Sequence, residues 1–75
     1  MSSTIGQLVK GERERRGWSR DELGRRAGMP GQHVGVIERA ATQRVSLRTA
    51  VRLSRALGVK LTAFVEAEDA TEVAK

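Results

Sequence analysis

Apolar residues recur along the start of the chain at the three- and four-residue spacing of an amphipathic helix. The first such stretch contains Ile5, Leu8 and Val9, with polar residues between them. It predicts a helix over about 3–16 that ends at Gly17, because glycine readily takes the left-handed conformation common at helix C-termini.

A capping box predicts the start of a second helix. Ser19 is followed three residues later by Glu22, so that each side chain can bond a free backbone N–H at the helix start. We expect this helix over about 20–27 and a third over about 30–39. The third contains two glycines, each of which costs about 1 kcal/mol of helix propensity against alanine, so packing must hold it.

The second half of the chain predicts two more helices. A connecting loop over 40–45 leads to Ser46, the expected cap of a fourth helix that ends before Gly58. A short fifth helix is expected over 61–66, and residues 67–75 are expected to form an acidic, flexible tail that frays. The buried face of the fourth helix is predicted to consist of Leu47, Ala50, Val51, Leu53, Ser54 and Leu57.

No stretch alternates as a β-strand would, so we expect a compact all-α fold of five short helices. Its 75 residues suffice for one domain, expected over 1–66. The absence of cysteine excludes a disulfide framework. With His33 as the only histidine, a fold stabilised by a structural zinc site is excluded too, and no metal or cofactor is expected.

The charge is uneven along the chain. Lys and Arg number 14 against 9 Asp and Glu, which gives a net charge of +5. The acids concentrate in the last ten residues, so the preceding part is strongly basic. This pattern indicates a polyanionic partner, most often nucleic acid, although a basic surface without a function remains the alternative. Neither a membrane span nor a signal peptide is apparent, so we expect a cytoplasmic protein.

The second and third predicted helices form a candidate helix–turn–helix. The first of them is short, Gly28 and Met29 occupy the turn, and Gly24 is small enough to let the two helices cross closely. These spacings together resemble the XRE family of phage repressors and Cro. The resemblance covers residues 5 to about 65 and is carried by Ile5-Gly6, Gly17-Trp18-Ser19-Arg20, Glu22-Leu23-Gly24, Ala27-Gly28-Met29, Ile37-Glu38-Arg39, Ser46-Leu47, Ala50-Val51 and Ala56-Leu57-Gly58-Val59.

The resemblance implies a five-helix, lambda-repressor-like fold, usually dimeric, that binds double-stranded DNA and regulates transcription. Arg13 lies on the apolar stripe of the first helix, four residues after Val9, where a lone charge would be costly. Glu38 is the candidate partner, and the resemblance implies an ion pair that presents Arg13 to a DNA phosphate. The alternative is that the Arg13 side chain reaches out to water.

Further DNA contacts follow from the resemblance. Arg20 stands where the family most often has a glutamine that binds a phosphate, and arginine can do the same with added charge. The resemblance also implies phosphate contacts in the loop before the fourth helix. This loop is about one residue longer than the pattern most common in the family and lacks the proline of that pattern. Its candidate residues are Thr42, Gln43 and Arg44.

Base reading would fall to the exposed face of the third helix, at Gly31, Gln32, His33 and Val36. Gln32 can bond adenine in a bidentate manner, and Val36 can touch a thymine methyl group. His33 can reach a phosphate or a base edge, whereas Gly31 offers only close approach of the backbone. This face is poor in hydrogen-bonding groups, so specificity is expected to be low or to depend on DNA shape.

No catalytic arrangement of residues is apparent, so an enzyme is not expected. We expect a sequence-specific transcription regulator, a repressor or autoregulator, that binds a palindromic operator as a homodimer through Leu61, Phe64 and Val65. The alternative is an antitoxin-like or accessory module that uses the same fold to bind a protein partner. The glycine-rich third helix and the acidic tail favour this alternative.

Overall fold

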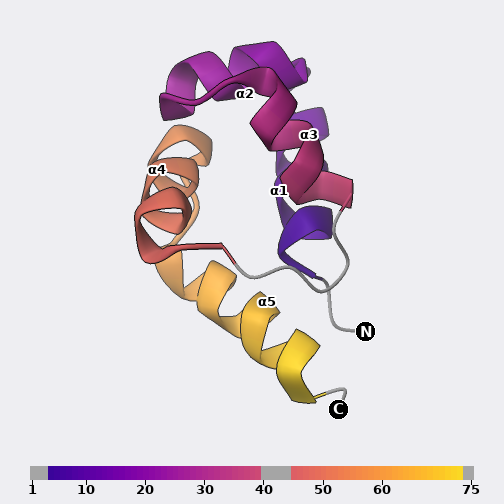
Figure 1. Cartoon of the computed structure of the whole chain (residues 1–75), viewed down its shortest axis with the longest axis vertical. Coiled ribbons are helices and arrows are strands. Elements are labelled where there is room, and N and C mark those ends of the chain that lie inside the picture. The colour runs from indigo at the N-terminus through magenta and orange to yellow at the C-terminus, as the bar shows by residue number, and fades with distance from the viewer. Residues whose placement is uncertain (1–3, 40–44, 74–75) are drawn as a thin grey trace.

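Five α-helices make up the part of the chain that the computed structural model describes, residues 4–39 and 45–73 (Figure 1). No strand occurs in these residues, and the all-α prediction is confirmed. In chain order the helices are α1 (Ile5–Arg15), α2 (Arg20–Ala27), α3 (Gly31–Arg39), α4 (Leu47–Leu57) and α5 (Leu61–Val73).

Hydroxyl side chains cap the starts of three helices. The Ser19 and Ser46 hydroxyls accept hydrogen bonds from backbone N–H groups in the first turns of α2 and α4, as their positions in the sequence predict. At the start of α1, Thr4 and Gln7 form a complete capping box, which was not among the sequence predictions. In α2 only one of the two capping-box bonds forms, from the Glu22 backbone N–H to the Ser19 hydroxyl, because the Glu22 carboxylate pairs with Arg25 and Arg26 instead.

The core lies where the inward faces of all five helices meet. In Figure 1, α2 lies across one end of the bundle, where it packs against α3 and α4, while α1 packs against α3 and α5. Each large apolar side chain that is fully buried contributes about 1.5–3 kcal/mol relative to an exposed one. The largest of these are Val9, Leu23, Val34, Leu53, Leu57 and Phe64.

The structure corrects two expectations about α4 and α5. Helix α5 continues to Val73 instead of ending near 66, because alanines and glutamates favour helix, no glycine or proline follows, and Ala67 is still buried. Leu47 is 71% exposed, so it does not belong to the buried face of α4. The division into a domain over 1–66 and a flexible tail over 67–75 stays a prediction.

Candidate nucleic-acid interface

Two glycines set the angle between α2 and α3. Gly28 ends α2 with a left-handed backbone (φ 75°, ψ 37°), which turns the chain sharply toward α3. A Cβ atom at Gly24 would lie 2.4 Å from the Met29 carbonyl oxygen, so only glycine permits this crossing. Met29 is half-buried against the core, as expected for an apolar residue in the angle of a helix–turn–helix.

The outer face of α3 is open to solvent. Val34 and Ile37 point into the core, while Gln32, His33 and Val36 are exposed, Val36 at 40%. The sequence-predicted base-reading residues therefore share one free face of this helix, together with the partly exposed Gly31.

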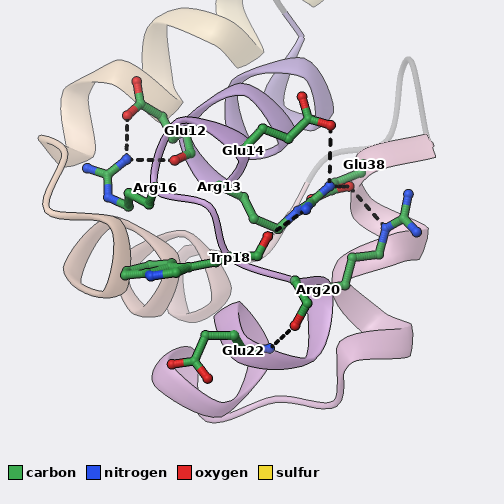
Figure 2. Close-up of polar contacts among 9 residues, drawn as sticks. Glu12, Arg13, Glu14, Arg16, Trp18, Arg20, Glu22 and Glu38 are labelled. Atoms are coloured by element: carbon green, nitrogen blue, oxygen red, sulfur yellow. Dashed lines mark hydrogen bonds and ion pairs between the residues drawn. The ribbon is translucent and has the colours of Figure 1, made fainter.

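Arg13 and Glu38 form a bidentate ion pair between α1 and α3 (Figure 2). Arg13 Nε donates to Glu38 Oε2 at 2.7 Å and Nη2 donates to Oε1 at 3.1 Å, while Nη1 donates to the Trp18 carbonyl at 2.8 Å. The side chains are 10% and 1% exposed. The hydrogen bonds to Glu38 raise the pKa of the Arg13 guanidinium, which therefore keeps its charge inside the protein.

A second guanidinium binds the same carboxylate, which the sequence did not predict. Arg20, at the start of α2, donates from Nε to Glu38 Oε1 at 3.2 Å, and its side chain is 47% exposed. Glu38 thus joins three helices and faces two cations, one buried and one half open to solvent. Of these groups, the Arg20 guanidinium is the cation that faces solvent, which suits an anionic ligand such as a phosphate.

An open pocket lies between α2 and α3 beside this cluster. It brings together candidate phosphate-binding residues and part of the candidate base-reading face, whereas His33 and Val36 lie outside it. Arg39 also lines the pocket, and it was not among the predicted site residues. The one feature of the sequence that could have indicated this role is its position, one helical turn after Gly35. The lining residues are Arg13, Ser19, Arg20, Asp21, Gly31, Gln32, Gly35 and Arg39.

The comparison with protein families agrees with this geometry. Residues 9–64 match the family model described as helix-turn-helix, which spans most of α1, all of α2, α3 and α4, and the start of α5. The chain belongs to this helix–turn–helix family. The family comprises XRE-type, lambda-repressor-like domains that bind DNA and regulate transcription and are not typically enzymes. A comparison with curated proteins finds no match.

Several other arginines of this helix–turn–helix domain bind glutamates on their own helix. Arg25 and Arg26 each approach Glu22 to 2.6 Å. The hydrogen bond from Arg25 has the largest effect on the Glu22 carboxyl, and together with that from Arg26 it lowers the pKa of this group. Arg26 also stacks 4.2 Å from the centre of the Trp18 ring. Among the described residues, the basic side chains without an ion pair are Lys10, Arg39, Arg48, Arg52, Arg55 and Lys60.

The remaining predicted site residues lie on α5 or in the loop before α4. Phe64 is 1% exposed, so its expected contact with a second subunit is corrected: the side chain fills the core and has no surface to offer. Val65 is 50% exposed and Leu61 is partly buried, so both keep free apolar surface. The candidate phosphate contacts Thr42, Gln43 and Arg44 lie outside the described residues.

The described residues contain neither a membrane-spanning helix nor a metal-binding cluster. None of the helices there has the length and apolar character needed to cross a membrane. Residues 4–39 and 45–73 also contain no group of three or more His, Cys, Asp or Glu side chains placed to hold a metal ion.

Proposed function

We propose that this domain acts in the cytoplasm as a homodimer, binds a palindromic DNA operator, and represses transcription, including that of its own gene. One observation carries the proposal: the Arg13–Glu38–Arg20 cluster lies directly beside the exposed face of α3. Cations suited to phosphates and a helix face free to enter the major groove therefore share one surface.

Phosphate contacts would fix the position of the domain on DNA. Arg20 is the principal candidate, because its guanidinium is half exposed and its Nη groups have no protein partner among the described residues. Arg13 is largely buried, so it would act mainly by bracing Glu38 and α3 and would offer a phosphate only its remaining surface. Thr42, Gln43 and Arg44 would extend these contacts along the backbone.

Base contacts would come from the open face of α3. Gln32 can donate to and accept from adenine in a bidentate manner, and Val36 can pack on a thymine methyl group. His33 would reach a phosphate or a base edge, and Gly31 would allow the backbone to come close. Since Gln32 is the one amide on this face, we propose that the affinity for the operator exceeds that for random DNA only modestly, and that DNA shape contributes to the difference.

Two substitutions should separate phosphate binding from base reading. Arg20→Ala should weaken binding to every DNA sequence and reduce the slope of log K against log salt concentration by about one. Gln32→Ala should instead cost about 1–3 kcal/mol on a selected operator and leave binding to random DNA unchanged. Fluorescence anisotropy with both DNAs across a salt series measures the two effects.

Arg25→Ala is the matched control for Arg20→Ala, because Arg25 is exposed on the same helix but pairs with Glu22 away from the pocket. It should retain wild-type affinity apart from a small effect of net charge. Equal losses on operator and random DNA for both Arg20→Ala and Gln32→Ala would contradict the proposed division of roles. Failure of the wild type to bind either DNA would contradict the function itself.

Dimerisation would use the exposed side of α5. Val65 and Leu61 keep apolar surface there, and two copies related by a two-fold axis would place their α3 helices on half-sites about 10 base pairs apart. Val65→Asp should therefore reduce self-association at least tenfold, and at concentrations where the wild type is also monomeric it should not lower the melting temperature, because the position is open to water. Sedimentation velocity at micromolar concentrations tests this, and a wild type that stays monomeric at high concentration would rule out the homodimer.

A protein-binding role is the second candidate function. Gly31 and Val36 leave the open face of α3 with few side chains that can form hydrogen bonds to bases, which favours an antitoxin-like or accessory module that binds another protein. The DNA titration above separates the two candidates, because this module would show weak, sequence-independent binding or none.

A further inference from the structure

Helices α4 and α5 carry opposite charges that are not balanced on the same helix. Helix α4 has three arginines and no acid, whereas α5 has four acids and neither lysine nor arginine. Within the described residues, none of the α4 arginines forms an ion pair, and neither does the exposed Glu66 of α5. Unpartnered charges of both signs therefore remain on two helices of one small domain.

The arginines of α4 lie on the side of the helix that is opposite to the core. Their spacing of four and three residues places them on one face, which we call the arginine face: Arg48, Arg52 and Arg55. All three side chains are exposed, while Ala50, Leu53, Ser54 and Leu57 form the buried side of the helix. The arginine face is therefore free to meet a ligand.

Helix α5 of the same chain lies on the wrong side of α4 to supply that ligand. It packs on the core side, where Phe64 shares the core with Leu53 and Leu57. Figure 1 shows the second half of α5 extending away from α4 toward the C-terminus. The partner of the arginine face is therefore expected on another molecule.

We propose that the arginine face of α4 binds α5 of a second copy of this chain. On both helices an exposed apolar residue directly precedes the charged series: Leu47 (71% exposed) on α4 and Val65 (50% exposed) on α5. The charges then extend over about two helical turns, at positions 48, 52 and 55 of α4 and 66, 69 and 72 of α5. Two such helices lying side by side in the same direction match apolar with apolar and base with acid.

A two-fold axis forms this contact twice, because α4 and α5 of each copy meet α5 and α4 of the other. Single exposed ion pairs contribute little, so the contact depends on the whole series of charges and on the apolar pair beside it. This inference rests on the proposed homodimer and names the surface that receives the exposed side of α5.

Removal of the arginine charges tests the proposal through the sign of its effect. Each copy has a net charge of +5, so a dimer held by other contacts should tighten when positive charge is removed. Loss of the arginine face should instead weaken self-association about 10–100-fold, and added salt should weaken the wild-type dimer in the same direction. Sedimentation velocity at low and high salt measures both effects. The variant carries Arg48→Gln, Arg52→Gln and Arg55→Gln.

The matched control removes the same charge from α1 and α2, at positions that are also exposed: Lys10→Gln, Arg15→Gln and Arg25→Gln. It should self-associate as tightly as the wild type or slightly more tightly. Equal self-association of the control and the α4 variant would overturn the proposal. So would an α4 variant that keeps the dimer but loses more DNA affinity than the control, because the arginine face would then bind DNA.

An exchange of charge between the two helices shows whether they meet. One variant reverses α4 (Arg48→Glu, Arg52→Glu and Arg55→Glu), and the other reverses α5 (Glu66→Lys, Asp69→Lys and Glu72→Lys). Each should be monomeric at concentrations where the wild type is a dimer, because like charges then face each other. An equimolar mixture should form a heterodimer, since both contacts again join opposite charges, and this recovery also shows that the variants fold.

Net charge alone would also draw these two variants together, so a second mixture is needed. In it, the α4 variant is replaced by a chain of the same net charge with Lys10→Glu, Arg15→Glu and Arg25→Glu. This mixture should associate less tightly, because one of its two contacts still joins like charges. Equal association in both mixtures would overturn the proposal. A wild type that stays monomeric at high concentration would instead refute the proposed homodimer, and the role of the arginine face with it.

Discussion

Replacement of Glu38 by alanine should lower the free energy of unfolding by about 3–5 kcal/mol, the loss typical when one partner of a buried ion pair is removed. Glu38 receives three hydrogen bonds from two guanidiniums, and its side chain is 1% exposed. The substitution leaves Arg13 charged and 10% exposed, with the Trp18 carbonyl as its remaining close partner.

Arg13 cannot avoid this cost by losing its proton. Its pKa, ordinarily far above neutrality, is raised further by Glu38 in the native protein and stays above any accessible pH without it. The guanidinium must therefore move toward water, which disturbs the contact between α1 and α3. A domain of 75 residues has a total stability of about 4–11 kcal/mol, so the expected loss is a large share of it.

Urea unfolding followed by circular dichroism measures this loss, and Glu14→Ala is its control. Glu14 also approaches Arg13, at 3.9 Å, but its side chain is 58% exposed, so its removal should change stability by at most about 0.5 kcal/mol. Equal stabilities for Glu38→Ala and Glu14→Ala would mean that the buried pair contributes nothing to the fold.

The helices near the start of the chain were predictable because their signals are local. Ser19 and Gly28 stand at the two ends of α2, and the structure uses both as caps. The apolar spacing on α3 likewise separated its buried face from its open face, where Gln32 lies. In such cases, a few neighbouring residues decide the conformation without help from the rest of the fold.

Contacts between distant residues were harder to predict from the sequence. The bond from Arg20 to Glu38 depends on the crossing of α2 over α3, which Gly24 permits and helical periodicity alone does not specify. Helix α5 was underestimated because its second half has little apolar pattern, although its composition favours helix.

Phe64→Asp should unfold the domain or bring it close to unfolding. Loss of a buried phenylalanine costs about 3–5 kcal/mol, and a carboxylate placed in the same apolar site adds the cost of burying an unpaired charge. Phe64 is 1% exposed and is the largest of the fully buried side chains, with Leu53 and Leu57 in the same core. The expected loss equals or exceeds the stability of most domains of this size.

The neighbouring position gives the control for this prediction. Val65→Asp introduces the same charge one residue along α5, but at a side chain that is 50% exposed, so it should stay folded and lose only the stability that self-association adds. Circular dichroism melts of the two variants, with sedimentation on the same samples, separate folding from dimerisation. If Phe64→Asp kept native helix content and melting temperature and lost only the dimer, Phe64 would belong to the subunit interface and α5 would pack differently on α1 and α4. If instead Phe64→Asp unfolds while Val65→Asp stays folded and becomes monomeric, α5 has two roles on opposite sides: one closes the core and the other holds the partner subunit.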